Sequence, residues 1–251
     1  MNKKVLVIGG TSGIGFSISK VFAKKNYDVT IVSSNIENLE KALIDLKKIN
    51  SDCSYLKCDL KNEAEVNNLS KLLLNQRENL DCVVFSSCKG LFGKINEIED
   101  EKFINYFNTF VVSNLKLLKN IFNKNQKTRI IYLSSYIAHF DIPNYNNYSL
   151  VKLTIDNFLQ KLKAENNYRR ILTVYPGSVK TDFDEKSELI GKFKFKKSIN
   201  KKSPDEVAEK ILKSYENYEN VLHFSILMKL LFFSKNIISK FLNFIVNIFF
   251  K

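Results

Sequence analysis

A glycine-rich loop directly after a short apolar run is the feature that most constrains the fold of this chain. Residues 5–8 (Val-Leu-Val-Ile) have the length and β-branched character of a buried strand, and Gly9-Gly10-Thr11-Ser12-Gly13-Ile14-Gly15 follows at once. A helix-period segment, residues 14–25, begins inside the same motif. Glycines let the backbone approach a phosphate closely, and a helix N-terminus offers free N–H groups and a positive dipole. The pattern predicts a strand–loop–helix unit that binds the pyrophosphate of a dinucleotide.

Strand-length apolar runs alternate with helix-period segments along the rest of the chain. The runs are apolar on both faces, as in a parallel sheet covered on both sides, and comprise residues 5–8, 29–32, 82–85, 130–133 and 171–174. The helical segments comprise residues 14–25, 36–49, 63–76, 101–123 and 148–166. This alternation predicts an α/β fold: a single Rossmann-type, doubly wound parallel sheet with helices on both faces. Few Pro and Gly residues and no linker interrupt the 251 residues, so we expect one domain.

One more helix and a tail follow the predicted sheet. Ser203, Pro204 and Glu206 match an N-cap, a first helical position and a capping box, which predicts a helix to about Tyr215. Residues 221–224 are expected to form a last strand. We therefore divide the chain into a catalytic domain, residues 1–225, and a hydrophobic, basic tail of amphipathic helices, residues 226–251.

The formal net charge of +13 has two interpretations. Either lysines are spread over the surface through compositional bias, or the chain meets an anionic partner. No nucleic-acid recognition motif is present, so a nucleic acid is not the expected partner. The four cysteines form no CxxC pair, which argues against a zinc site and favours a reducing, cytoplasmic compartment. His139 and His223 are lone histidines for which we expect surface or packing roles.

Tyr148 and Lys152 lie four residues apart and should share one face of a helix. A free tyrosine has a pKa near ~10 and is a poor proton-transfer group at neutral pH. A neighbouring ammonium group, together with the positive charge of an oxidised nicotinamide, would stabilise the phenolate and lower that pKa. The pair alone is also compatible with an ordinary surface contact.

The glycine motif and the Tyr-x-x-x-Lys pair occur together, and with them the chain resembles the short-chain dehydrogenase/reductase family over about residues 3–225. The resemblance implies NAD(P)-dependent hydride transfer between a nicotinamide and a carbonyl or alcohol. It places the catalytic serine on Ser135, thirteen residues before Tyr148, and the catalytic asparagine on Asn108. Ser135 would stabilise the charge on the substrate oxygen, and Tyr148 would transfer the proton. Lys152 would bind the ribose and lower the Tyr148 pKa, while Asn108 would hold a water that links Lys152 to solvent.

Two neighbours compete with these assignments. Ser134 could be the active serine, although the spacing favours Ser135. Tyr145 could compete with Tyr148, yet it lacks a lysine four residues on.

The resemblance also implies a set of cofactor contacts. They are Gly9, Thr11, Ser12, Gly13, Ile14 and Gly15 in the first loop, Ser34, Asp59, Leu60 and Ser86 after later strands, Tyr148 and Lys152, and Pro176, Gly177, Val179 and Thr181 in a Pro-Gly loop. The family's Asn-Asn-Ala-Gly motif is missing, because residues 85–90 read Phe-Ser-Ser-Cys-Lys-Gly. Ribose contacts there are in doubt, and Cys88 is either near the cofactor or a buried structural thiol.

The sequence gives only a weak indication of whether the cofactor is NAD(H) or NADP(H). NAD specificity usually requires an acid at the end of the second strand, and this chain has Ser33-Ser34-Asn35 instead. No acid repels a 2′-phosphate, so we favour NADP(H) over NAD(H), although the usual arginine is also absent.

Two basic segments suggest the substrate. Residues 186–202 contain seven lysines, with Phe193, Phe195 and Ile199 interleaved. They form either a solvated lid or one that grips an anionic or membrane-bound substrate. In the tail, lysines and asparagines recur at near-helical spacing on a broad apolar background, too interrupted for a spanning helix. Such a helix lies either in a membrane interface or in an oligomer interface.

Together these features resemble the reductases of polyprenyl-phosphate-linked keto-sugars. They predict a keto group on a lipid-linked substrate, reduced at the cytoplasmic face of a membrane. Ketosphinganine-type reductases also combine this fold with a hydrophobic tail. A homo-oligomeric reductase of small ketones or acyl thioesters and a non-catalytic dinucleotide sensor remain alternatives.

Overall fold

The computed structural model has a central seven-stranded sheet in the order β3-β2-β1-β4-β6-β7-β9. It describes residues 2–75, 80–124, 128–166, 170–195, 201–231 and 234. Every strand pairs in parallel with its neighbours. The strands are β1 (Lys4–Ile8), β2 (Asp28–Ser33), β3 (Ser54–Lys57), β4 (Cys82–Phe85), β6 (Arg129–Leu133), β7 (Ile171–Tyr175) and β9 (Val221–His223). The predicted Rossmann-type α/β fold is therefore confirmed.

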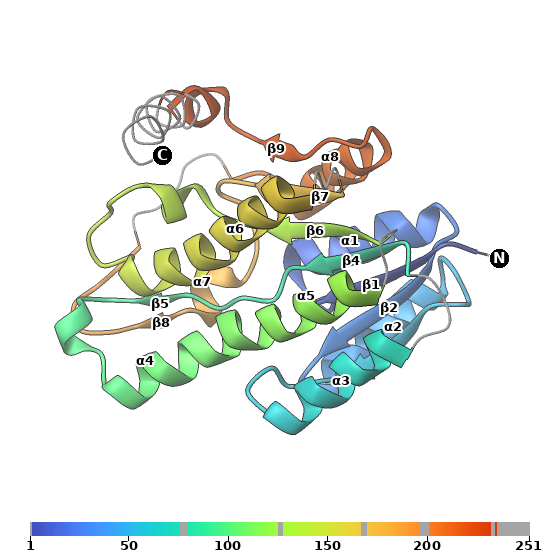
Figure 1. Cartoon of the computed structure of the whole chain (residues 1–251), viewed down its shortest axis with the longest axis horizontal. Helices are drawn as coiled ribbons and strands as arrows, with labels where there is room; N and C mark the ends of the chain where they lie inside the picture. Colours follow the sequence, from blue (N-terminus) through green and yellow to red (C-terminus); the bar gives the residue numbers. More distant parts are fainter. Residues whose placement is uncertain are drawn as a thin grey trace.

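Helices cover both faces of the sheet. On one face lie α1 (Gly13–Lys24), α2 (Ile36–Lys47) and α8 (Pro204–Glu216). On the other lie α3 (Glu63–Asn75), α5 (Ser113–Lys124) and α6 (Asn146–Asn166), which run along the sheet in Figure 1. Strand β1 shows why its sequence is apolar throughout: Val5 and Val7 pack in the first layer, and Leu6 and Ile8 pack in the second.

Three strands have no counterpart in the predicted pattern. β3 forms one edge of the sheet, and its residues are half-buried or exposed, so it lacks the apolar run of a central strand. β5 (Leu91–Phe92) and β8 (Glu188–Leu189) form a separate two-stranded parallel sheet. A two-residue strand whose partner lies almost a hundred residues away has no local periodicity to reveal it.

The segment predicted as one helix over residues 101–123 is interrupted in the structure. Helix α4 (Asp100–Phe107) passes into a π-helical stretch, Asn108–Val112, and then into α5. In this stretch the backbone N–H of Ser113 donates to the carbonyl of Asn108, and the Ser113 hydroxyl donates to Leu60 O at 2.8 Å. Such π stretches are frequent at functional sites.

The C-terminal part begins as predicted. The Ser203 hydroxyl accepts from Glu206 N at 3.1 Å and caps α8, and β9 follows. Residues 226–231 are helical, and Ile226, Leu227 and Leu230 are exposed there. Except for Ser234, the rest of the predicted tail lies outside the described residues. Within those residues, no helix combines the length and the apolar character needed to cross a membrane.

Candidate active site

One large cavity of about 1800 Å³ opens where the parallel strands end. The loops after β1, β4, β6 and β7 contribute to its wall. All the residues proposed above for the catalytic or cofactor site line this cavity. Ligands of open α/β sheets bind at this edge, because the loops and helix N-termini after the strands converge there.

The glycine loop is shaped by close backbone contacts. Gly9 has a φ of +84°, a conformation that favours glycine. A Cβ atom on Gly15 would overlap the Gly9 carbonyl and the Ser86 hydroxyl. The Ser86 hydroxyl donates to Gly9 O at 3.0 Å, so this predicted cofactor residue also holds the glycine loop against β4.

The N-terminus of α1 fits an anionic group. Its N-cap, Ser12, makes no side-chain capping bond, and its first turn holds no acid. By contrast, α2 is capped by the Asn35 side chain and α8 by Ser203, and both have acids in the first turn. The free N–H groups and positive dipole of α1 therefore lie open to the cavity, as the pyrophosphate of a dinucleotide requires.

The part of the cavity wall at the end of β2 is polar, and no acidic residue lies at that strand end. Ser33, Ser34, Asn35 and Asn38 line it, although only Ser34 was predicted as a contact. Thr11 Oγ1 donates to Ser33 Oγ at 3.4 Å, which ties the glycine loop to this end. The polar residues that follow the second apolar run in the sequence could have indicated Ser33, Asn35 and Asn38 as well.

Asp59 and Leu60 line the cavity beyond β3. Asp59 Oδ1 accepts from Lys61 N at 3.0 Å, and the Leu60 carbonyl accepts from Ser113. This second bond connects the loop after β3 to Ser113, directly after the π-helical stretch.

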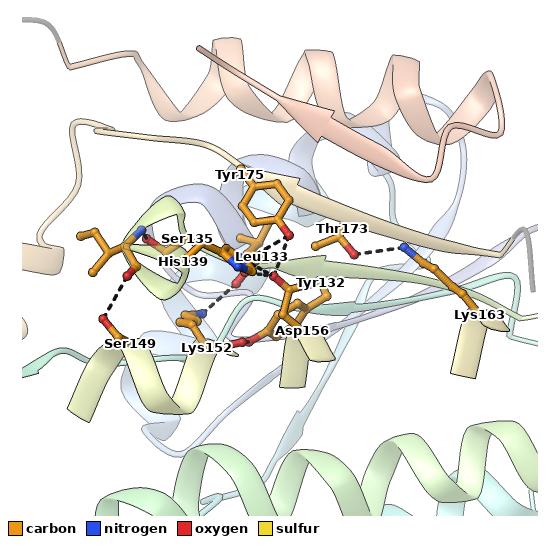
Figure 2. Close-up of polar contacts among 12 residues, drawn as sticks. Tyr132, Leu133, Ser135, His139, Ser149, Lys152, Asp156, Lys163, Thr173 and Tyr175 are labelled. Atoms are coloured by element: carbon orange, nitrogen blue, oxygen red, sulfur yellow. Dashed lines mark hydrogen bonds and ion pairs between the residues drawn. The ribbon is translucent and has the colours of Figure 1, made fainter. Parts of the chain in front are cut away.

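Ser135, Tyr148 and Lys152 meet between β6 and α6. Ser135 directly follows Ser134 at the end of β6, and its hydroxyl accepts from Ile137 N at 3.2 Å. Lys152 is buried, and its Nζ donates to Leu133 O at 2.7 Å (Figure 2). The same Nζ lies 5.8 Å from the Tyr148 ring centroid. The sheet thus supplies a backbone carbonyl that fixes the lysine beneath the tyrosine.

Burial governs the protonation of Tyr148 in this structure. Burial raises the pKa of Tyr148, the Cys88 thiol raises it further, and a hydrogen bond with Ser135 lowers it. Burial outweighs the other contributions because the phenol is only 8 % exposed. The phenol of Tyr148 is therefore protonated at neutral pH in this environment.

The two competing residues take other positions. Ser134 is buried and donates to Asp156 Oδ2 at 3.0 Å, whereas Ser135 bonds to Tyr148. Tyr145 packs its ring against Phe92 and Phe193.

Asn108 lies at the start of the π-helical stretch, is exposed and lines the cavity. Its carbonyl accepts from the Ser113 backbone and from Ser113 Oγ at 3.2 Å.

The Pro-Gly loop after β7 closes the opposite wall. Gly177 has a φ of +71°, and Lys180 N donates to Lys202 O at 2.8 Å. An added Cβ on Gly13 would lie 3.1 Å from Thr181 Cγ2, so this loop approaches the glycine loop directly.

An aromatic cluster that the sequence did not reveal packs against Tyr148. The fully buried Phe92 ring lies 5.4 Å from the ring of Tyr148 and 5.6 Å from that of Phe193. Phe183 and Phe195 also contact Phe92. The β5–β8 pairing holds the cluster together, since Ile190 N donates to Phe92 O at 2.8 Å. The pairing of β5 with β8, two segments far apart in the sequence, therefore forms this part of the cavity wall.

His139 has a packing role, but in a polar network. Its Nε2 lies 2.8 Å from Asp156 Oδ2, and the ring of His223 stacks on Tyr175 nearby. Cys88 is half-buried and lines the cavity, and burial raises the pKa of its thiol. The fully buried Cys82 is a free thiol.

The comparisons with known proteins agree with this geometry. A family model described as short chain dehydrogenase matches residues 3–189. A protein named dehydrogenase/reductase SDR family protein 7-like, from Dictyostelium discoideum, is 28% identical over 204 residues, which cover 76% of this chain and 64% of that protein. Carbonyl reductase family member 4 from Xenopus laevis is 25% identical over 223 residues, covering 84% of this chain and 90% of the relative.

Solved structures show the same fold. A short-chain dehydrogenase from Sphingobium yanoikuyae in complex with NADPH superimposes with a TM-score of 0.85 at 15% identity, covering 96% of this chain and 94% of the other. The chain belongs to the short-chain dehydrogenase family. This membership confirms the predicted class, the NAD(P)-dependent dehydrogenases and reductases.

Proposed function

We propose that this chain reduces a keto group on a lipid-linked, polyprenyl-phosphate sugar with NADP(H), using Asn108, Ser135, Tyr148 and Lys152. The observation that carries the proposal is that these four side chains line the same cavity as the open N-terminus of α1. A dinucleotide-binding end and a proton-transfer end in one cavity are what a carbonyl reductase needs.

Each residue has a role that follows from its position. A bound nicotinamide dinucleotide would supply the hydride. Ser135 donates a hydrogen bond to the substrate oxygen and stabilises its developing charge. Tyr148 gives that oxygen its proton. Lys152, held by Leu133 O, binds the nicotinamide ribose and favours the phenolate after transfer. Asn108 holds the water through which Lys152 recovers a proton.

The residues that would hold the cofactor are those of the loops described above. The glycine loop, Gly9 to Gly15, takes the pyrophosphate, Asp59 and Leu60 the adenine, Ser86 the ribose side, and Pro176, Gly177, Val179 and Thr181 the carboxamide end. Ser33 and Ser34 favour a 2′-phosphate over a free hydroxyl, because no carboxylate at the end of β2 repels it. The preference for NADP(H) rests on this point.

The aromatic cluster and the nearby lysines support a partly apolar, anionic substrate. Phe183 and Phe195 line the cavity, are half-buried and offer aromatic surface to an isoprenoid segment, and the buried Phe92 packs against both. Lys186 and Lys201 also line it, although they pair with Asp182 at 3.0 Å and Asp184 at 2.6 Å. Lys196, Lys197 and Ile199 of the predicted lid lie outside the described residues.

The tail supplies the membrane contact in this proposal. The exposed Ile226, Leu227 and Leu230 begin the apolar face that would rest on a lipid surface. The alternative is an oligomer interface formed by the same face. Gel filtration without detergent separates the two: a clean soluble oligomer contradicts the membrane contact.

A cofactor-oxidation assay tests the function. NADPH and NADH are mixed with polyprenyl-phosphate keto-sugars, a long-chain keto-sphingoid base, small ketones and an acyl thioester. We expect oxidation of NADPH with the keto-sugars and loss of this activity in Tyr148→Phe. If the sphingoid base or the small ketones are turned over faster than the keto-sugars, the proposed substrate is wrong. No activity on any carbonyl would favour a non-catalytic dinucleotide sensor.

A further inference from the structure

A buried carboxylate lies directly behind the catalytic residues. Asp156, on α6, has no exposed surface. Its Oδ2 accepts from Ser134 Oγ at 3.0 Å and Tyr175 Oη at 2.6 Å, and lies 2.8 Å from His139 Nε2. Figure 2 shows His139 and Tyr175 converging on Asp156 beside the catalytic lysine. A buried charge is tolerated only when such donors surround it, so these partners hold each other in place.

Two of the three partners bracket the turn that carries Ser135. Ser134 immediately precedes Ser135, and His139 ends the short helix Tyr136–His139 that follows it. Both ends of the turn are thus fixed to one carboxylate oxygen. Between them, the Ile137 carbonyl accepts from Ser149 Oγ at 3.1 Å, which ties the middle of the turn to α6.

The remaining contacts reach the other walls of the site. Tyr175 is the last residue of β7 and directly precedes Pro176 of the Pro-Gly loop. Burial and the charge of Asp156 raise the pKa of Tyr175, so its hydroxyl stays protonated and donates. Asp156 itself lies one helical turn after Lys152. One carboxylate therefore connects the serine turn, the tyrosine–lysine helix and the Pro-Gly loop.

We propose that Asp156 is a positioning residue. Through its contacts with Ser134, His139 and Tyr175, it holds the Ser135 hydroxyl and Tyr148 in their relative positions. This inference rests on the proposed carbonyl reductase function. Asp156 does not face the substrate; it acts through the elements it holds. Because catalytic groups must be placed closely, loosening the turn should lower the rate of the chemical step more than it weakens binding.

The test uses variants that each change one polar group of the network and little volume. Ser134→Ala and Tyr175→Phe remove one donor each, and Asp156→Asn keeps an acceptor while removing the charge. Kinetics are measured with NADPH and the carbonyl compound that the wild-type chain reduces fastest. We expect kcat to fall by about tenfold in Ser134→Ala and Tyr175→Phe, with KM and the NADPH Kd within about twofold of wild type.

A matched control separates positioning from a general loss of stability. Ser214 is also buried and donates to a carboxylate, Glu219 Oε2 at 2.8 Å, but it lies on α8. Ser214→Ala should lower the thermal midpoint about as much as Ser134→Ala and leave kcat unchanged. Equal kcat values for the two variants would overturn the inference.

A double-mutant cycle tests whether Ser134, which Asp156 holds, acts through Ser135. In a Ser135→Ala background, adding Ser134→Ala should have almost no further effect on kcat, because the group being positioned is already gone. Full additivity of the two effects would overturn the inference while leaving the proposed function intact. A wild-type chain that reduces no carbonyl would overturn both.

Discussion

The ammonium of Lys152 donates to the backbone carbonyl of Leu133 at 2.7 Å, and this bond joins helix α6 to the end of the central strand β6. Leu133 O lies two residues before Ser135, so the same strand end positions both of these proposed catalytic residues. The bond also gives the buried Lys152 side chain a hydrogen-bond acceptor. It thereby holds the lysine close to the Tyr148 ring.

Replacing Lys152 by methionine should nearly abolish turnover. The change removes the cation that favours the phenolate and leaves Leu133 O without this donor, so we expect kcat to fall by about 100-fold or more. Steady-state NADPH oxidation measures it. Lys210→Met, an exposed lysine of similar size that pairs with Glu206 on α8, should leave the rate unchanged. A Lys152→Met enzyme with near wild-type kcat would remove Lys152 from the mechanism.

Gly15→Ala should weaken cofactor binding. The added methyl would overlap the Gly9 carbonyl and the Ser86 hydroxyl, which pushes the glycine loop away from β4. We expect the NADPH Kd to rise by about tenfold, or roughly 1.4 kcal/mol, in a fluorescence titration. Ser17→Ala, on the same helix but bonded to Asp205 away from the cavity, is the control. Unchanged affinity in Gly15→Ala would show that the loop can shift without cost.

Phe92→Leu should alter substrate binding as well as stability. Phe92 is 1 % exposed and contacts five aromatic rings around Tyr148, so its truncation should cost about 1–2 kcal/mol in urea unfolding. We also expect a higher KM for the apolar carbonyl substrate. Phe22→Leu, an equally buried phenylalanine in the core layer of α1, α2 and α8, should lose similar stability with an unchanged KM. Equal KM values in both variants would mean that the aromatic cluster only packs.

Lys163→Met should stabilise the protein at neutral pH. Burial lowers the pKa of Lys163 from 10.5 to about 8, although Asp156 opposes this shift. Between those values the unfolded chain binds more protons than the native one, so the free energy of unfolding rises with pH across this window. Below about pH 8 the full burial cost is present. Removing the charge should add about 1–2 kcal/mol at pH 7, allowing for partial exposure, and abolish that rise.

Urea unfolding at pH 7, 8, 9 and 10 measures this effect. Asn220 O keeps its bond from Thr173 N at 3.0 Å in the variant, so no carbonyl is left unpaired. Lys213→Met, an exposed lysine on α8, should show the wild-type pH dependence. If Lys163→Met unfolds with the wild-type pH slope, burial does not lower the pKa of Lys163.

The amino-acid sequence determined the central strands, the helices between them and the residues that face the cavity. It could do so because buried parallel strands are apolar on both faces, and because the glycine loop and the tyrosine–lysine pair depend on short, local spacings. The edge strand β3, with its half-buried residues, carried no such signal.

Only the tertiary structure decided what surrounds those residues. The pairing of β5 with β8 brings Phe92 and Phe193 together across about a hundred residues, and no local pattern encodes that contact. In the same way, Asp156 gathers Ser134, His139 and Tyr175 from a strand end, a turn and another strand. The environment of Tyr148 was also decided there, because burial of the phenol raises its pKa. Local spacing sets which groups share an element, but packing between elements sets how far each is removed from water.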